Sequence, residues 1–314
     1  MRVLLIPIWH PLTYCIERAF VDLGHEVRVV DWRKYYKEKR RGDVEPVCIK
    51  AAKEFKPDLC FAQFQTHGVI TKAFPEALRK LGCFSIQWSG DVRHPLPSHY
   101  TDLAPYFDVT SFSNGTDVEI VRALGYRSEF LQIGYDATVY HTEGAGERKG
   151  VVFLGNNYGE YKFAESASRR SMVQAMAEAY PDDFMVYGTA WEGVVPAKNC
   201  GGYAPEGTDA DILRRSLVAV GYDHFHRPGF ASDRLLRATA CGCATVNQHY
   251  EGIESEHPYV GAAHSIDDMV RMVGYALRNP EQSKVVGEQA AQWTKDHHQW
   301  TERVREIEKW MSQK

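Results

Sequence analysis

The sequence predicts an α/β protein with two Rossmann-like, doubly wound domains that face each other across a cleft. Strand-length apolar runs alternate with helical apolar spacing along nearly the whole chain. The alternation stops once, at the Gly- and charge-rich segment 143–150 (EGAGERKG), and then resumes. The 314 residues fit two domains of roughly 100–200 residues each. We expect an N-terminal domain at 1–142, a linker at 143–150, a C-terminal domain at 151–296 and a last helix at 297–314.

The first half begins with a continuous apolar run at 2–8, which is typical of a strand buried on both faces of a parallel sheet. Residues 16–23 then carry apolar side chains at helical spacing, and Gly24 ends that helix. The same patterns predict strands at 26–32, 58–65, 83–88 and 109–113. They predict helices at 44–55, 72–81 and 117–124. Pro75 fits its helix only if it lies in the first turn.

The second half repeats this order of strands and helices. Strands are predicted at 150–154, 184–187, 217–220 and 245–247. Helices are predicted at 171–180, 212–215, 233–241, 266–277 and 299–311. Because strands alternate with helices in both halves, each half is expected to form a parallel sheet.

The composition excludes several classes of protein. A net charge of −4 gives no global positive field toward nucleic acid or membranes, and the longest apolar runs are only strand-length. The N-terminus lacks a signal-peptide pattern, and the seven cysteines are odd in number without CxxC spacing. We expect reduced thiols and a cytoplasmic protein. We expect no metal site, since HExxH does not occur.

Ligands of open α/β sheets bind beyond the carboxyl ends of the strands, and the segment ASDRLLR follows one such strand. Ser232 is a good helix N-cap, and Asp233 and Arg234 fall in the first turn. Free N–H groups at a helix start, beside a guanidinium, favour a diphosphate. The alternative is an ordinary capped helix with Arg234 in a surface ion pair.

A second segment, VVFLGNNYGEYKF, has a similar character. Gly155 and Asn156 follow the first strand of the second half, and Lys162, Arg169 and Arg170 come before the next predicted helix. Backbone N–H groups of a Gly turn with flanking cations favour a phosphate. A strand-to-helix loop with solvated charges is equally compatible with this pattern.

His224 and His226, in GYDHFHRP, are a further pair within reach of a sugar or a phosphate. Their spacing also fits the two sides of a strand end.

In the first half, His10 follows the first strand and is a candidate base for an acceptor hydroxyl. Asp91 follows the fourth strand beside Arg93, and its carboxylate is a candidate base or a group that positions the acceptor. A loop-capping histidine and an Asx turn are the corresponding structural alternatives.

The segment 33–41 (RKYYKEKRR) is basic and contains two tyrosines. Lys37, Arg40 and Arg41 would contact a phosphate backbone in a loop that binds DNA, while the tyrosines stack on bases. A solvated basic loop is the alternative.

Long stretches of the chain resemble GT-B glycosyltransferases, most closely the family-4-like and spore-maturation-type members that also occur in phage genomes. In the second half the stretch SLVAVGYDHFHRPGFASDRLLRATACGCATV is similar to the nucleotide-binding signature region. WHPLTYCIERAFVDLGHEVRVV resembles the family's opening, and LQIGYDATVYH its interdomain segment. HHQWTERVREIEKW resembles the terminal helix that crosses back to the first domain.

The resemblance implies roles for individual residues. Arg234 would meet the donor diphosphate, Gly155 and Asn156 would lie beneath it, and His10 would stand where inverting relatives keep a base.

The sequence departs from the family-4 pattern at two positions. Arg237 and Gly229 occupy the places of two glutamates, of which the first holds the donor ribose, so Asp233 or Glu251 would have to replace that contact.

The resemblance implies a hexosyltransferase-like enzyme that uses a nucleotide-diphosphate sugar, most plainly a UDP-sugar, as co-substrate without a permanently bound cofactor. A hydroxymethylated pyrimidine in DNA is one candidate acceptor, and a small metabolite or a cell-envelope glycan is another. A non-catalytic nucleotide- or sugar-binding protein and a nucleotide-sugar epimerase are the alternatives.

Overall fold

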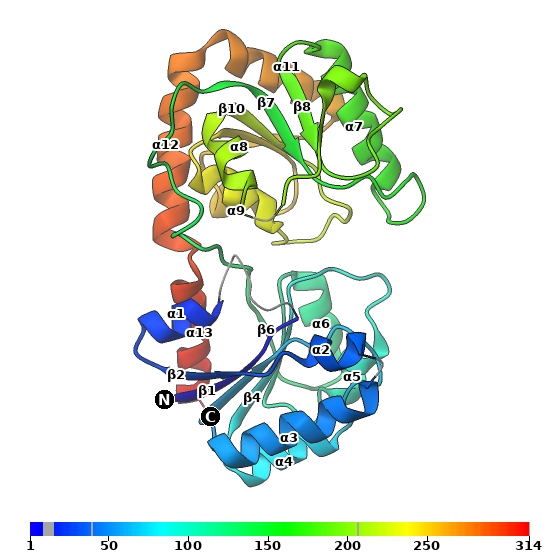
Figure 1. The fold of residues 1–314 in the computed structure, drawn as a ribbon, viewed down its shortest axis with the longest axis vertical. Coiled ribbons are helices and arrows are strands. Elements are labelled where there is room, and N and C mark those ends of the chain that lie inside the picture. Colours follow the sequence, from blue (N-terminus) through cyan, green and yellow to red (C-terminus); the bar gives the residue numbers. More distant parts are fainter. Residues whose placement is uncertain (9–15, 39, 206, 314) are drawn as a thin grey trace. The chain divides into compact units, whose positions relative to one another are not determined.

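The computed structural model describes residues 1–314 except 9–15, 39, 206 and 314. The chain divides into two compact units, which we name unit 1 (Met1–Gly134 with Trp300–Lys314) and unit 2 (Tyr135–Gln299). Each unit contains one six-stranded parallel sheet with helices on its faces (Figure 1). The predicted fold class of two Rossmann-like domains is confirmed. The segment 143–150, expected as a linker, lies within unit 2.

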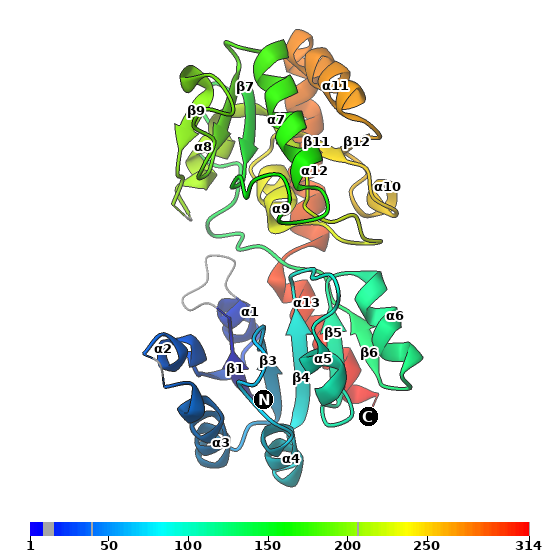
Figure 2. The ribbon, with the colours of Figure 1, turned by 90° about the vertical axis from the view of Figure 1, so that its right-hand side faces the viewer.

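The sheet of unit 1 has the strand order β2-β1-β3-β4-β5-β6, and every neighbouring pair is parallel (Figure 2). Its strands are β1 (Arg2–Ile6), β2 (Glu26–Val29), β3 (Leu59–Ala62), β4 (Phe84–Ser89), β5 (Val109–Phe112) and β6 (Ser128–Phe130). Its helices are α1 (Ile16–Asp22), α2 (Trp32–Lys37), α3 (Val44–Phe55), α4 (Ala73–Lys80), α5 (Ser98–Leu103), α6 (Gly115–Ala123) and α13 (Trp300–Ser312). Pro75 is the third residue of α4, in its first turn as expected.

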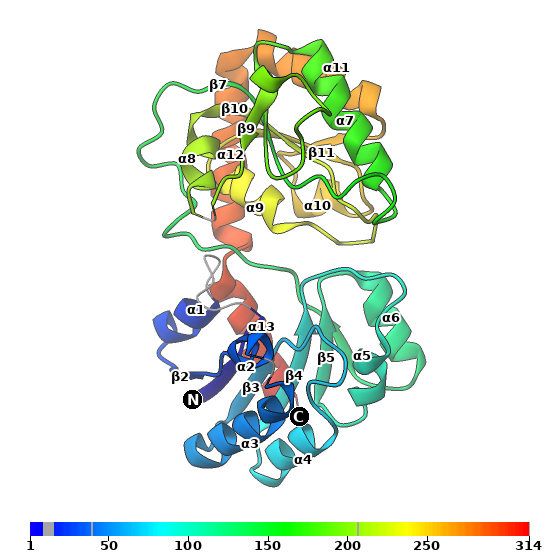
Figure 3. The same cartoon turned by 45° about the vertical axis from the view of Figure 1, so that its right-hand side comes forward.

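The sheet of unit 2 has the order β12-β11-β10-β7-β8-β9 and is also parallel throughout (Figure 3). Its strands are β7 (Lys149–Leu154), β8 (Phe184–Tyr187), β9 (Cys200–Gly202), β10 (Ser216–Gly221), β11 (Ala244–Gln248) and β12 (Gly261–Ala263). Its helices are α7 (Ser166–Ala179), α8 (Asp209–Arg215), α9 (Asp233–Ala240), α10 (Ile253–Glu256), α11 (Ile266–Arg278) and α12 (Pro280–His297).

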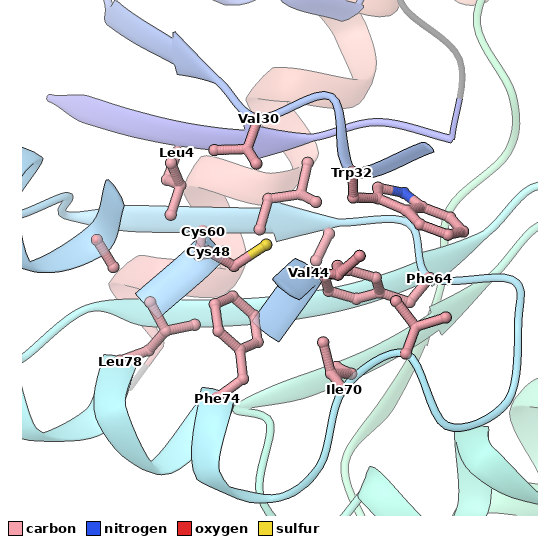
Figure 4. Packing of buried hydrophobic residues seen from close by; sticks show 14 of the residues in the cluster. Leu4, Val30, Trp32, Val44, Cys48, Cys60, Phe64, Ile70, Phe74 and Leu78 are labelled. Atoms are coloured by element: carbon pink, nitrogen blue, oxygen red, sulfur yellow. The ribbon is translucent and has the colours of Figure 1, made fainter. Parts of the chain in front are cut away.

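Each sheet is buried on both faces, because successive side chains of a strand point to opposite sides. In unit 1, Leu4 and Cys60 pack with residues of α3 and α4 on one face (Figure 4). Leu5 and Phe61 pack with α1 and α13 on the other face. In unit 2, α7 and α11 cover one face, while α8 and α9 cover the other. The arrangement leaves the carboxyl ends of the strands for polar residues.

The sequence prediction of a strand at 26–32 is too long. β2 ends at Val29, and α2 begins at Trp32 because the Asp31 carboxylate accepts the backbone N–H of Lys34 at 3.3 Å. Much of the basic segment at 33–41 is therefore helical, and the expectation of a loop there is wrong for residues 33–37.

Helix α12 is absent from the sequence prediction. Its buried residues are small or polar and give no apolar stripe, with Gly287, Ala290 and Thr294 among them. A Cβ at position 287 would lie 2.2 Å from the carbonyl oxygen of Gly242, so the close packing there requires glycine. Helical periodicity misses such a helix because backbone contact replaces large side chains.

Two further properties bear on the sequence expectations. The described cysteines form no disulfide, and Cys200 alone among them is not buried. In the described part of the chain, no helix has both the length and the apolar character needed to cross a membrane.

Candidate functional site

Polar and charged side chains of unit 2 gather where β7 and β10 end. These two strands are neighbours and parallel, so the residues that follow them meet at one edge of the sheet. Gly155 follows β7 directly, and Asp223 and His224 follow β10 after Tyr222. The first turns of α7 and α9 supply Arg169 and Arg234.

Arg169 lies against the glycine that follows β7. A Cβ at Gly155 would lie 1.8 Å from its Nη2 atom, so only glycine leaves room for this guanidinium. Arg169 is 2% exposed and lies over the Phe153 ring, 4.9 Å from its centroid. Within the described residues, none of its three guanidinium nitrogens has a hydrogen-bond partner. Burial, and then the nearby charge of Arg234, lower the pKa of Arg169 to about 9.

Arg234 is the second cation of the site. Its Nη2 donates to Asp223 Oδ1 at 2.9 Å, and the side chain remains 32% exposed. Asp223 is held in turn, since its backbone N–H donates to Gln248 Oε1 at 3.2 Å. The ion pair involves a nearly buried partner, so it orients the guanidinium more firmly than a surface pair would.

His224 remains neutral within this group of cations. Burial, followed by the charges of Arg169, Arg234 and Lys162, lowers the pKa of His224 to about 3. Its Nδ1 lies 3.5 Å from the Ser166 hydroxyl. A neutral imidazole offers one donor and one acceptor, so it can bind a polar ligand without adding positive charge.

An aromatic loop carries Lys162 to the same place. The rings of Tyr158 and Phe163 lie 5.3 and 4.7 Å from that of His224, centroid to centroid. Lys162 Nζ lies 4.5 Å from the centroid of Tyr158. Gly155, Lys162, His224 and Arg234 thus share one neighbourhood.

The predicted neighbours of these residues have local partners. The Oδ1 atom of Asn156 accepts the backbone N–H of Thr189 at 2.9 Å and so fixes the loop after β7. Arg170 lies 3.7 Å from Glu160. His226 is exposed.

The sequence prediction started α7 too late, at 171 rather than Ser166. The polar first turn, SASRR, carries no apolar repeat, and this hid the helix start. Arg169 and Arg170 are consequently helical, and Arg169 is the one that reaches Gly155.

Part of the hydrogen-bonding capacity at the start of α9 is already used by residues of the helix itself. Ser232 occupies the N-cap position without a side-chain hydrogen bond into the helix. The Asp233 carboxylate instead accepts the backbone N–H of Arg234, and it pairs with Arg237 at 2.8 Å. The candidate anion-binding groups of this region are therefore the two guanidinium groups rather than the helix start.

Arg237 stands where the family-4 pattern has a ribose-binding glutamate. It is 8% exposed and pairs with Asp209 at 3.0 Å as well as with Asp233. Its guanidinium lies 5.0 Å from the centroid of Tyr140, whose hydroxyl donates to Asp209 at 3.0 Å. This closed ion network holds α8, α9 and the segment before β7 together and leaves Arg237 no role at a ribose.

The candidate catalytic residues belong to unit 1. His10 lies outside the described residues. Asp91 follows β4, is exposed and accepts a hydrogen bond from Arg93 at 3.0 Å. The backbone N–H of Asp91 donates to the Ser89 hydroxyl at 3.3 Å, so Ser89 rather than an Asx turn shapes this loop.

The basic segment of unit 1 is partly neutralised. Arg40 pairs with Asp43 at 2.7 Å and lies over the Tyr35 ring. Arg41 lies over Tyr36, and Lys37 is exposed at the end of α2. Two of the predicted acceptor-binding cations therefore already stack on the two tyrosines.

Comparisons with known proteins agree with this architecture. Residues 169–309 match a family model described as glycosyl transferase-like. No curated protein matches the chain.

Three solved structures resemble the chain over its whole length. Sucrose-phosphate synthase of Thermosynechococcus elongatus has a TM-score of 0.67 at 7% identity, covering 100% of this chain and 98% of its own. HepE of Anabaena in complex with UDP has a TM-score of 0.66 at 10% identity, covering 100% of both chains. A glycosyltransferase of Rickettsia africae has a TM-score of 0.67 at 7% identity, covering 99% and 98%. The fold is that of the GT-B glycosyltransferases, and the glycosyl transferase-like family model covers residues 169–309 of the chain.

Proposed function

We propose that the protein transfers a sugar from a nucleotide-diphosphate donor, with a UDP-sugar as the first candidate, to an acceptor hydroxyl. The observation that carries this proposal is the buried guanidinium of Arg169, which has unused donors beside Gly155 and Arg234. A buried cation of this kind needs an anion to compensate its desolvation. The structural neighbour HepE has been solved with UDP and with UDP-glucose, which supports this class of donor.

The guanidinium groups act on the leaving group. During transfer, the bond between the anomeric carbon and the diphosphate oxygen breaks while the acceptor oxygen bonds to that carbon. The acceptor proton goes to a base, and the nucleoside diphosphate leaves with the electron pair. Arg169 and Arg234 stabilise the negative charge that grows on the diphosphate, and each such donor is typically worth roughly 10²–10³ in rate. Neutral His224 adds a hydrogen bond.

The ribose contact needs a different residue from that of the family-4-like and spore-maturation-type enzymes that the sequence resembles. Arg237 and Asp233 are engaged with one another. Of the two replacements considered, Glu251 is the one that stays exposed, beside the loop where its carbonyl accepts the Gly229 N–H at 3.1 Å. We assign the ribose hydroxyls to Glu251.

Unit 1 would bind the acceptor, in line with its assignment as the N-terminal domain. Asp91 is the proposed base among the described residues, and its use as a base requires release from Arg93. His10 remains the other proposed base. The acceptor is a hydroxyl, and the geometry of the described residues does not select hydroxymethylated DNA over a small metabolite or an envelope glycan.

The donor assignment is tested by binding and turnover. Arg169→Ala and Arg234→Ala are compared with Arg215→Ala, which removes an exposed arginine at the end of α8. Calorimetric titration with UDP and hydrolysis of UDP-sugars are measured for all three variants. We expect both site variants to lose at least tenfold in UDP affinity and the Arg215 variant to match the parent. Unchanged binding and hydrolysis in both site variants would falsify the assignment.

A further inference from the structure

Two histidines and a glutamate meet further along the same carboxyl edge of the unit 2 sheet, where β11 and β12 finish. His249 is the first residue after β11, and His264 is the first after β12. Glu254 is the second residue of α10. One ligand atom from each side chain lies within 4.8 Å of those of the other two. His249 Nε2 and Glu254 Oε1 are 3.4 Å apart, and the two imidazole rings stack with centroids 4.2 Å apart.

The backbone brings these residues together. β11 and β12 are parallel, with Gln248 opposite Ala263, so the next residues, His249 and His264, follow the two strands side by side. The backbone N–H of His249 donates to the Ala263 carbonyl at 2.8 Å, which continues the pairing. Gly252 then takes a φ of 102°, a left-handed conformation that glycine adopts without strain, and the chain turns into α10. This turn places Glu254 over the paired histidines.

The donor set matches a divalent transition metal. Imidazole nitrogens and a carboxylate oxygen are the ligands that Zn²⁺ takes in open sites, at roughly 2.0–2.2 Å. Around a tetrahedral ion such ligand atoms lie roughly 3.3–3.5 Å apart, and His249 and Glu254 already meet this spacing. His264 and Glu254 are exposed, so their side chains can rotate. Such a rotation can bring the ligand atom of His264 to the same spacing from the other two.

A hydrogen bond to the Asp268 carboxylate fixes the backbone at His264, one of the three ligands. The Asp268 carboxylate accepts the backbone N–H of His264 at 3.1 Å, and Arg271 donates to the same carboxylate at 3.0 Å. Such outer contacts fix a metal-binding loop before the ion arrives.

We propose that His249, Glu254 and His264 bind a zinc-class divalent ion in a three-ligand site with an open position. The sequence spacing, H-x₄-E-x₉-H, is not HExxH, and only the pairing of β11 with β12 makes it a site. The ligands differ from the residues of the guanidinium pair, although both groups lie along the carboxyl edge of one sheet, where β11 is the neighbour of β10. It would fix the segment from 249 to 264 against the sheet.

The experiment uses the whole chain, freed of metal with a chelator and titrated with Zn²⁺ and Co²⁺. Calorimetry reports the affinity, and the visible absorption of bound Co²⁺ reports nitrogen and oxygen coordination of low symmetry. His249→Ala, His264→Ala and Glu254→Gln are compared with His67→Ala, which removes an exposed histidine of unit 1. We expect each ligand variant to weaken Zn²⁺ binding at least tenfold and to abolish the Co²⁺ spectrum, and the His67 variant to keep both.

The readout is independent of transferase activity. Melting in the absence of metal shows whether each variant folds, and His249→Asn and His264→Asn replace any alanine variant that does not. Zn²⁺ should raise the melting temperature of the parent and the His67 variant but not of the ligand variants. Equal Zn²⁺ affinity in the parent and in the double variant His249→Ala, His264→Ala would overturn the proposal.

Discussion

Replacing Arg169 with methionine should stabilise the free protein while it removes donor binding. The guanidinium is 2% exposed, and burial is the main cause that lowers its pKa from the ordinary value of an arginine to about 9. At about 1.4 kcal/mol per pKa unit, keeping the charge in the native state costs on the order of 4–5 kcal/mol. For a cation with a lowered native pKa, this cost is fully present below about pH 9 and disappears only as pH rises toward the ordinary pKa of an arginine.

Methionine has no charge to desolvate, and its flexible thioether can fill the space beside the Phe153 ring. Since the substitution also loses that cation–π contact, we expect a net gain of about 1–4 kcal/mol. For units of this size, this corresponds to a rise in melting temperature of roughly 2–4 °C per kcal/mol. Saturating UDP should shift this difference toward the parent, because ligand at 100 times its Kd stabilises only the binding-competent parent, by about 2.7 kcal/mol.

The assay is thermal unfolding of the parent, Arg169→Met and Arg169→Lys, each with and without UDP. Arg169→Lys keeps a cation but loses the forked donors, so it should gain little stability and bind UDP weakly. If Arg169→Met is destabilised by more than about 1 kcal/mol, or if UDP still raises its melting temperature as in the parent, the reasoning is refuted.

Three further predictions concern the neighbourhood of this residue. Gly188→Ala should lower the free energy of unfolding by about 2–4 kcal/mol, measured by denaturant unfolding, because φ is +145° and a Cβ would lie 2.1 Å from the Gly155 carbonyl oxygen. A variant as stable as the parent would contradict this close contact between Gly188 and Gly155. Arg237→Glu should cost at least about 3–5 kcal/mol by placing a carboxylate beside Asp209, and a well-folded variant with new ribose selectivity would contradict the ion network. His224→Gln should flatten the loss of stability on acidification from pH 6.5 to 3, because the lowered pKa of His224 keeps it neutral in the native state while the unfolded chain takes up a proton. Identical urea midpoints against pH for parent and variant would reject that last prediction.

The central strands of both sheets could be predicted from the sequence, because a parallel strand buried on both faces has a continuous run of apolar residues. β1 and β3 are of this kind. The three-residue strands β6, β9 and β12 are too short to show any repeat, and they were not predicted. Edge strands of this length form because a neighbouring strand offers its free backbone groups, a tertiary effect that no local pattern contains.

The choice between two adjacent arginines shows the same limit inside the site. Arg169 and Arg170 are equally basic in the sequence, and on a helix they point about 100° apart. Which one faces Gly155 depends on where α7 begins, and the polar first turn hides that start. The signal that was available is the glycine itself, since a glycine directly after a buried strand indicates that another group approaches the backbone closely.

Protonation of His224 and binding of a diphosphate depend on the same set of charges. Arg169, Arg234 and Lys162 are the cations that lower the pKa of His224, after burial. A bound diphosphate would neutralise them, and the Asp223 carboxylate already compensates part of the charge of Arg234. Whatever raises the pKa of His224 must, by reciprocity, bind more tightly when that histidine is protonated. The low pKa of His224 and the unused donors of Arg169 thus have a common cause, which is an excess of positive charge at this edge of the sheet. A bound diphosphate would balance that charge.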